Sequence, residues 1–233
     1  MSLLTIIQQV SLQIGLPKPD TVALSPDLQA QQMVAMVNLA GEALARRYEW
    51  QALNQEASFT TVATELQGAI ATIAPGFRFI INDTIWNRTQ QDQIAGPLSP
   101  SQWQAMKSTV ATGPYSNYRI KDGGLYLYPV PVAGDSAYFE YRSNAWAADS
   151  GGTAKTSMTL DDDTALLDEH LLQLALRWRY LEARGLDYGE AMREHEKEVN
   201  QAMAKDGGKS SVYLKHMNIS GPSARAPDGS WAI

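Results

Sequence analysis

The chain has 233 residues, of which 44% are hydrophobic and 19% are charged, and its formal net charge is −6. This length is sufficient to bury a substantial core, whereas an acidic chain is not expected to bind nucleic acid nonspecifically. Because the sequence contains no cysteine, it excludes a cysteine nucleophile and thiolate-ligated zinc or iron–sulfur centres, and nothing indicates a disulfide scaffold.

Two helices are expected at the N-terminus. Apolar residues spaced by four, three and four positions predict a helix over residues 3–14, which Gly15 ends. The sequence Ser25-Pro26-Asp27 combines a capping side chain, a proline suited to the first helical position and an acidic residue, so a second helix should run from there to about Tyr48. Since the connecting loop is short, the two helices should pack antiparallel.

From about residue 51 the pattern changes to strands. Short runs rich in aromatic and β-branched residues favour a sheet, and Ser99-Pro100 should open a short helix at 101–108 with Trp103 and Met106 facing inward. Strands are expected at residues 57–62, 77–81, 84–88, 118–121, 125–128 and 137–142.

The clearest turn signal is Asp122-Gly123, because this pair accepts the positive φ angles of a tight hairpin. In the last strand, alternation should put Phe139 and Tyr141 on one face and Tyr138 and Glu140 on the other. The small-residue segment 147–160 is interpreted as a loop and hinge that leads from the sheet back to helices.

Two further helices are expected near the C-terminus. An apolar stripe spaced by four and three positions predicts a helix at 164–184, and a narrower seam predicts another at 187–204. The stripe residues are Leu167, Leu171, Leu174, Trp178 and Leu181, and the seam residues are Tyr188, Met192, His195, Val199 and Ala202.

Strands and helices are therefore segregated, which is typical of an α+β fold. Residues 1–50 and 161–205 should form one four-helix bundle, with residues 51–160 as a β-rich insert and residues 206–233 as an extended arm.

No catalytic, cofactor-binding or metal site is predicted. The acidic run Asp161-Asp162-Asp163 could in principle hold Mg²⁺ or Ca²⁺, but it is better interpreted as the N-terminus of the following helix, where acids oppose the helix dipole. His170, His195 and His216 do not share metal-ligand spacing. Neither a Gly-x-Ser-x-Gly motif nor a glycine-rich phosphate loop is present, although spacing alone does not exclude a Ser-His-Asp triad.

The tryptophans allow two interpretations. They could form a stacking platform for sugars or bases, but core packing is favoured for most of them, because each lies in an apolar pattern or at the end of an element. The residues concerned are Trp50, Trp86, Trp103, Trp146 and Trp178.

The C-terminal arm, residues 206–233, is rich in Gly, Ser and Pro and should not fold alone. Apolar residues nevertheless recur along it, so it is predicted to bind its own chain, a neighbouring copy or a partner. A simple frayed terminus is the alternative. The expected contact residues are Tyr213, Leu214, Lys215, Met217, Ile219, Trp231 and Ile233, together with Val212.

In this order of elements the chain resembles the head–tail adaptors of short-tailed bacteriophages, the family of the tail tubular protein A. The resemblance covers residues 3–205 and is one of pattern rather than of a signature motif. It is carried by Ile14-Gly15-Leu16-Pro17, Asn38, Glu42 to Arg47, Tyr48-Glu49-Trp50, the strand 55–62, Pro75-Gly76-Phe77-Arg78, Ile85-Trp86-Asn87-Arg88, Tyr126-Leu127-Tyr128-Pro129, Phe139-Glu140-Tyr141, Asp168-Glu169, Ala175 to Trp178 and Ala183 to Asp187.

The resemblance implies a structural virion protein rather than an enzyme. Such adaptors form a ring, expected here to be a dodecamer, that binds below the portal protein, carries the tail nozzle protein and extends the channel through which DNA passes without specific binding. The resemblance thus implies a place at the head–tail junction of the virion after synthesis in the bacterial cytoplasm.

The composition agrees with a soluble protein. The apolar N-terminus lacks the basic segment of a signal peptide, and no apolar run is long enough to cross a bilayer, so no membrane partner is expected. Two alternatives remain open: a tail-associated hydrolase or glycan-binding module, and a head- or tail-completion protein of a long-tailed phage.

Overall fold

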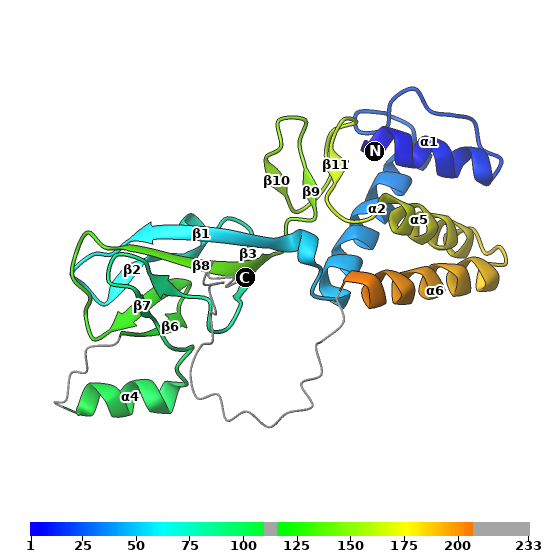
Figure 1. The fold of residues 1–233 in the computed structure, drawn as a ribbon. Coiled ribbons are helices and arrows are strands. Elements are labelled where there is room, and N and C mark those ends of the chain that lie inside the picture. Colours follow the sequence, from blue (N-terminus) through cyan, green and yellow to red (C-terminus); the bar gives the residue numbers. More distant parts are fainter. Residues whose placement is uncertain (110–115, 207–233) are drawn as a thin grey trace, which may run out of the picture.

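The computed structural model describes residues 1–109 and 116–206. Helices gather at one end of this part of the chain and antiparallel sheets at the other (Figure 1), so the predicted α+β class is confirmed. The helical end consists of α1 (Leu3–Gln13), α2 (Leu28–Arg47), α5 (Glu169–Ala183) and α6 (Gly189–Asp206).

The β-rich end contains the remaining elements. They are the 3-10 turn Gln51–Leu53, β1 (Asn54–Thr60), β2 (Leu66–Ala69), α3 (Ile70–Ile73), β3 (Phe77–Ile80), β4 (Trp86–Asn87), β5 (Asp92–Gln93), α4 (Pro100–Ser108), β6 (Asn117–Lys121), β7 (Gly124–Tyr128) and β8 (Ser136–Ser143). Between the two ends lie β9 (Ala147–Ala148), β10 (Ala154–Lys155) and β11 (Thr164–Ala165).

The largest sheet is organised around β8. This strand pairs along its length with β1, from Asn54 opposite Arg142 to Thr60 opposite Ser136, and also pairs with β3 and β4. A second sheet has the order β2-β7-β6, and a third, small sheet has the order β10-β9-β11. The long β1–β8 ribbon runs from the helices into the β-rich end (Figure 1), so it links the two parts.

The hairpin and the strand alternation were predicted correctly. Asp122 and Gly123, with φ of 51° and 70°, form the turn between β6 and β7. Along β8, Phe139 and Tyr141 are buried while Glu140 is exposed, because one face of the strand covers the β-rich core.

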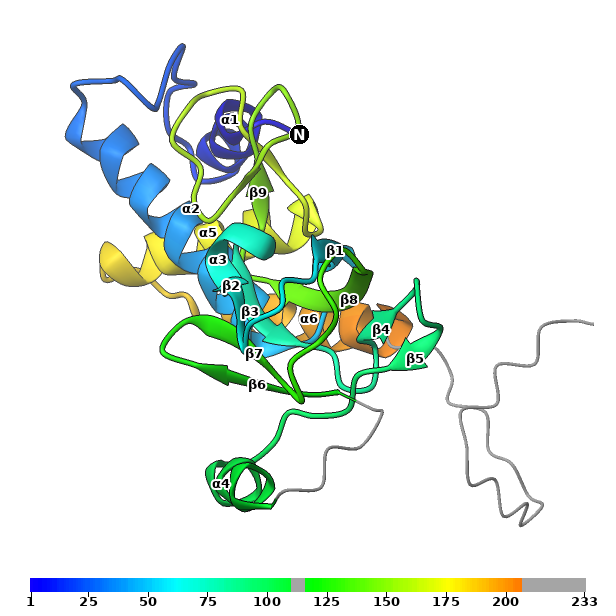
Figure 2. The same ribbon diagram turned by 90° about the vertical axis from the view of Figure 1, so that its left-hand side faces the viewer.

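The short helix was also located correctly. Ser99 and Gln102 form a complete capping box at the start of α4, and Trp103 is buried, although Met106 is only half-buried. The Trp103 ring packs edge-on against Tyr126 and Tyr128. Both ribbon views place α4 outside β6 (Figures 1 and 2), at the far side from the helical end.

The helical end has α5 at its centre. Residues 171–176 of α5 are buried in succession, since α1, α2 and α6 all contact this helix. The residues of the predicted stripe are all buried or half-buried, but the buried surface is wider than the stripe, because three neighbouring helices contact α5. The regular four-helix bundle is not confirmed: α2 crosses the other three helices in Figure 1, and α1 lies mainly against α5 rather than antiparallel to α2.

Several predicted boundaries were wrong for local reasons. The N-cap of α2 is Asp27, whose side chain accepts from the Gln29 N–H, so Pro26 precedes the helix. Of the strand predicted at 84–88, only Trp86–Asn87 pair as β4. The segment 147–160 is not simply a loop, because it contains β9 and β10.

The last two helices also begin later than predicted. Asp168, not the 161–163 run, caps α5, which therefore starts at Glu169. Helix α6 starts at Gly189, and the buried residues of its seam are Ala191, His195 and Val199, whereas Tyr188 and Met192 are exposed. The division into domains at residues 50, 160 and 205 stays a prediction.

Candidate interaction surfaces and the network that positions them

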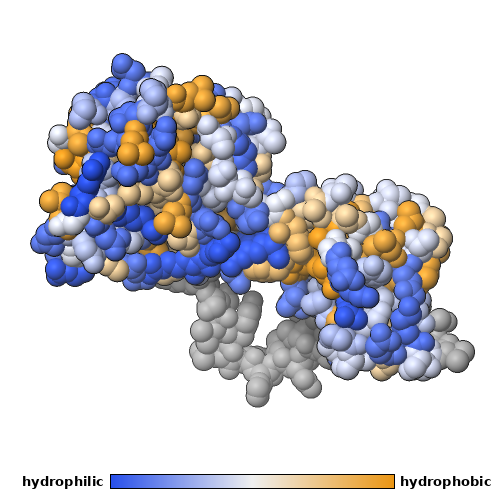
Figure 3. Space-filling model, turned by 180° about the vertical axis from the view of Figure 1, so that it is seen from behind, coloured by the Kyte–Doolittle hydropathy of each residue, from blue (hydrophilic) through white to orange (hydrophobic). Residues whose placement is uncertain are grey.

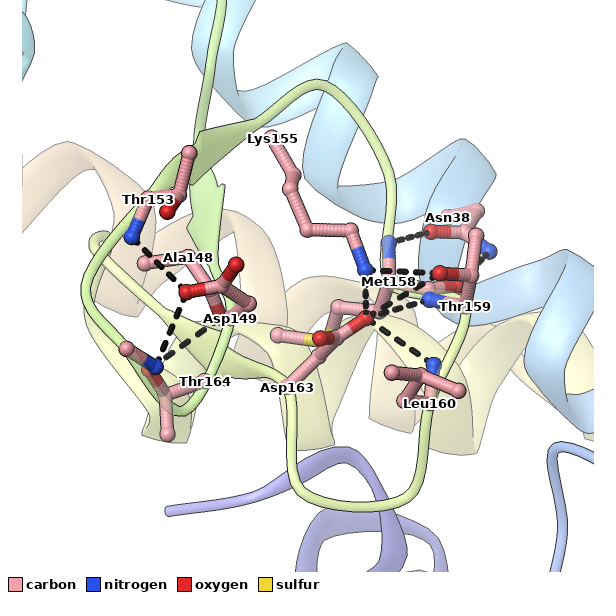
Figure 4. Close-up of polar contacts among 11 residues, drawn as sticks. Asn38, Ala148, Asp149, Thr153, Lys155, Met158, Thr159, Leu160, Asp163 and Thr164 are labelled. Carbon is pink, nitrogen blue, oxygen red and sulfur yellow. Dashed lines mark hydrogen bonds and ion pairs between the residues drawn. The ribbon is translucent and has the colours of Figure 1, made fainter.

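The junction between the two ends is built on a buried carboxylate. Asp163 is fully buried, and its Oδ2 accepts hydrogen bonds from Lys155 Nζ at 2.5 Å and from the backbone N–H groups of Thr159 at 2.6 Å and Leu160 at 2.9 Å (Figure 4). Burial alone would raise the pKa of this carboxyl, but the hydrogen bonds and the Lys155 charge outweigh it and lower the pKa. Asp163 therefore holds the loop after β10 as a carboxylate.

The same acidic run covers the start of α1 rather than that of α5. The backbone carbonyls of Asp163 and Asp161 accept from the N–H groups of Leu3 and Leu4, which no residue of α1 itself can satisfy. The Asp161 side chain in turn accepts from the backbone N–H of Val22 at 3.1 Å and Ala23 at 2.8 Å. The interpretation of residues 161–163 as the start of the following helix is thus wrong, because these carboxylates bind loop backbone.

Asn38 of α2 fastens the loop to the helices. Its Nδ2 donates to the Met158 carbonyl at 2.9 Å, and its Oδ1 accepts from the Met158 N–H at 2.7 Å (Figure 4). The Met158 side chain is fully buried in the helical core. A single amide side chain thus satisfies both backbone polar groups of a buried residue.

One tryptophan passes very close to α2. Trp146, immediately before β9, is 1% exposed, and a Cβ at Gly41 would lie 2.4 Å from three atoms of its indole ring. Only glycine therefore fits at position 41. Together with Asn38, this contact fixes the connecting segment 144–163 on α2.

Helices α2 and α6 are joined at their surface. Arg47 binds Glu196 with two parallel hydrogen bonds of 2.7 and 2.6 Å. This pairing lowers the pKa of Glu196. Next to it, His195 is 6% exposed, and neither ring nitrogen has a hydrogen-bond partner within the described residues.

A groove of about 350 Å³ opens at the end of α6. We call it the α6 groove. Its floor is apolar and includes Leu44 of α2, Trp50 and Leu171 of α5. Three carboxylates, those of Asp168, Glu198 and Asp206, line it together with one ammonium group, Lys205, so the groove is acidic.

A second groove, of about 660 Å³, lies between β3 and β6. Its lining includes three guanidinium groups, those of Arg78, Arg119 and Arg142, against the single carboxylate of Glu49. Arg142 is 3% exposed and donates to the Trp50 carbonyl, and burial lowers its pKa. The charged residues that line the two grooves are thus mainly acidic in the α6 groove and mainly basic in the β3–β6 groove.

Residues 1–109 and 116–206 hold no group of three or more His, Asp or Glu side chains suited to a metal ion. Over the same ranges, no helix combines the length and apolarity needed to cross a bilayer.

Comparison with protein families shows which family the chain belongs to. A family model, the SU10 adaptor protein, matches residues 1–217. The chain belongs to this adaptor family. The resemblance to phage head–tail adaptors is thereby confirmed, and the protein is a structural adaptor of a bacteriophage virion, a class that is not enzymatic. No curated protein is similar enough to the adaptor to count as a match.

The family match is longer than the resemblance expected from sequence patterns. It begins at residue 1 rather than 3 and continues past residue 205 to Met217, so it includes the first part of the predicted arm. All of the arm residues predicted to bind a partner lie outside the described residues. Their role stays a prediction.

Core packing of the adaptor's tryptophans is confirmed for three of them. Trp50, Trp103 and Trp146 are buried, while Trp86 and Trp178 are half-buried. His195 lies in the seam of α6 as predicted, and the exposed His170 lines the α6 groove.

Sequence reasoning missed the residues of the junction. The sequence did not predict the Lys155–Asp163 pair, because a Lys eight positions before an Asp in a Gly- and Thr-rich segment is not a recognisable pattern. Asn38 was noted in the resemblance, but only the structure shows that it binds Met158. A polar residue on the apolar side of a predicted helix was the available signal.

Proposed function

We propose that the adaptor forms a ring, with twelve copies as the expected number, that joins the portal protein to the tail nozzle protein and extends the DNA channel. The observation that carries this proposal is the match of the SU10 adaptor protein family to residues 1–217. The ring, its partners and the channel go beyond that match and are the content of the proposal.

The distribution of exposed apolar residues supports lateral contacts. Figure 3 shows hydrophobic patches on both the helical and the β-rich part of one face. A ring needs two different complementary surfaces on each copy, because heterologous contacts close by rotation. Exposed apolar side chains occur on the helical part at Leu12, Leu24, Leu28 and Leu39 and on the β-rich part at Val62, Leu66, Val130 and Val132.

The C-terminal arm is proposed to reach the portal or a neighbouring copy once the ring assembles. Its apolar residues alternate with Gly, Ser and Pro, a composition that suits an extended contact better than an independent fold. The proposed contact residues are Tyr213, Leu214, Lys215, Met217, Ile219, Trp231 and Ile233.

The net charge of −6 is compatible with a channel that DNA crosses without being held. Arg142 of the β3–β6 groove is not expected to bind DNA, because it is almost fully buried and donates to a backbone carbonyl.

Electron microscopy of the purified adaptor mixed with the portal protein tests the proposal. We expect rings on the portal, with twelvefold averages showing one copy for each portal subunit. The adaptor without portal is the control for self-assembly. An adaptor that stays monomeric and ignores the portal would contradict the proposal, whereas attachment to a long-tailed phage's completion proteins instead would favour that alternative.

A further inference from the structure

We propose that residues 209–219 bind in the α6 groove of their own chain before assembly. This contact is intramolecular and goes beyond the proposed function, since it requires neither a ring nor a portal. It gives the arm a first docking site on the molecule that carries it.

The chain leaves the described part at the edge of this groove. Asp206, the last residue of α6, lines the groove, and its Oδ2 accepts from the Gln51 N–H at 2.9 Å. Gly207 and Gly208 follow directly in the sequence. Because glycine adopts both signs of φ without a steric penalty, this pair permits the chain to turn back on α6.

The groove and the segment are complementary in their apolar surfaces. Residues of the helical core line the floor of the groove. Leu166, which is 37% exposed, extends the apolar surface at its rim. The segment supplies five apolar side chains within eight positions, a density that favours burial over solvent exposure. They are Val212, Tyr213, Leu214, Met217 and Ile219.

Their charges are complementary as well. The groove carries the carboxylates of Asp168, Glu198 and Asp206 against Lys205 alone, while the segment carries Lys209 and Lys215. No acidic residue occurs from position 207 to position 227. The basic β3–β6 groove is for the same reason a poor alternative, because like charges would face each other across it.

Length and the family match agree with this occupant. An extended chain spans roughly 3.3 Å per residue, so the thirteen positions between 206 and 219 exceed what is needed to return along the last turns of α6. The match to the adaptor family ends at Met217, inside this segment. The matched pattern therefore includes most of the proposed ligand.

Paired cysteines in the isolated full chain test the proposal. The sequence has no cysteine, so the two introduced thiols can form only one intramolecular disulfide. Ala202→Cys, in the groove, is combined in turn with Leu214→Cys and Met217→Cys. The matched control replaces Ala202→Cys by Ala204→Cys, an exposed position on the same helix that does not line the groove. Ala52→Cys, on another side of the groove, serves as a second groove site should the Ala202 variant fold poorly.

We expect at least one groove pair to form an intramolecular disulfide about tenfold faster than its Ala204 control. The control thiol lies two positions closer to the arm than Ala202, so a slower control reports docking rather than effective concentration. Adding Glu198→Lys should slow the groove pair. Equal rates for groove and control pairs, disulfides only between two chains, or a rate that Glu198→Lys leaves unchanged would each overturn the proposal. None of these results bears on the ring, because no portal is present.

Discussion

Gly41 lies in the interior of α2, where alanine is ordinarily the better residue by about 1 kcal/mol. Here the order is reversed, because an added Cβ would meet the buried Trp146 ring at 2.4 Å. We expect Gly41→Ala to lower the free energy of unfolding by about 1–3 kcal/mol, the usual range for overpacking a core. Denaturant unfolding measures the change.

The control for this substitution is Gly189→Ala, since a Cβ at Gly189 meets only Asp187 Oδ1 at an ordinary 3.5 Å. Combining Gly41→Ala with Trp146→Phe should restore part of the loss, because the two changes share one contact. If the losses in the free energy of unfolding are additive in the double variant, the Trp146 side chain is not the cause of the destabilisation.

Asp163 gives a pH-dependent prediction. Removing one partner of a fully buried ion pair costs roughly 3–5 kcal/mol. The Lys155 side chain is 24% exposed and can be hydrated when the carboxylate is removed, so Asp163→Asn should destabilise the adaptor at pH 7 by less than this. The exposed neighbour substitution Asp162→Asn is the control and should have little effect. Thermal unfolding of both variants and the parent protein gives the comparison.

The sign of the pH dependence follows from the lowered pKa of Asp163. The stabilisation is fully present above the ordinary value of 3.8 and is lost as the pH falls through the lower pKa of the folded state. The difference in unfolding temperature between the parent protein and Asp163→Asn should therefore become smaller at acidic pH. A gap that stays constant down to pH 2 would contradict an ionised Asp163.

At the scale of elements, the contact between α5 and α6 depends on an uncharged histidine. Burial lowers the pKa of His195 below its ordinary 6.5, and Arg47 of α2 and Arg179 of α5 lower it further, while Glu196 opposes them. The Trp178 ring lies 6.2 Å from the imidazole. Because the unfolded chain takes up the proton more readily, stability should be full above pH 6.5 and should fall as the pH drops from 6.5 towards the folded-state pKa.

We therefore expect His195→Leu to unfold at a temperature that changes less between pH 7 and pH 5 than that of the parent protein. The substitution also removes two buried nitrogens without hydrogen-bond partners, so stability at pH 7 should be unchanged or higher. His170→Gln, at an exposed position, controls for the loss of a histidine. An unchanged pH dependence in His195→Leu would show that other groups cause it.

The elements that sequence reasoning predicted well depend on local chemistry. The Asp122-Gly123 turn and the helix start at Ser99-Pro100 need only nearby residues, and both are present as expected. The predicted start of α5 was wrong because the acidic residues before it bind backbone groups that are distant in the sequence. No local pattern predicts such contacts. Ala147 and Ala148 resembled a loop because alanine has low strand propensity, yet both are buried and pair with β10 and β11.

At the scale of the whole molecule, the long β1–β8 ribbon and the connecting segment 144–163 join the two cores. Arg78 of β3 also donates to backbone carbonyls of α2, and Arg142 of β8 donates to the Trp50 carbonyl, so the two ends are joined by directed hydrogen bonds as well as by the chain itself. In the proposed ring, each copy needs its lateral surfaces at a fixed distance from each other. The hydrogen bonds between the two ends favour such a fixed distance.

The arm provides the last prediction at this scale. A chain that ends at Asp206 retains every described element, so it should still unfold cooperatively. We expect it to bind the portal far more weakly than the full chain does, because the apolar arm residues are lost. Single substitutions should each remove part of the affinity: truncating an anchoring aromatic such as Tyr213 or Trp231 to alanine costs about 2 kcal/mol at a well-packed interface.

Binding of the full chain, the shortened chain and both alanine variants to purified portal is compared by sedimentation or surface immobilisation. Ser223→Ala, within the arm but without a large side chain, is the matched control and should bind as the full chain does. Far-UV circular dichroism excludes unfolding as the cause of any loss. Equal affinity of the shortened and full chains would show that residues 207–233 do not contribute to attachment, and the portal contact would then have to lie on the described surfaces.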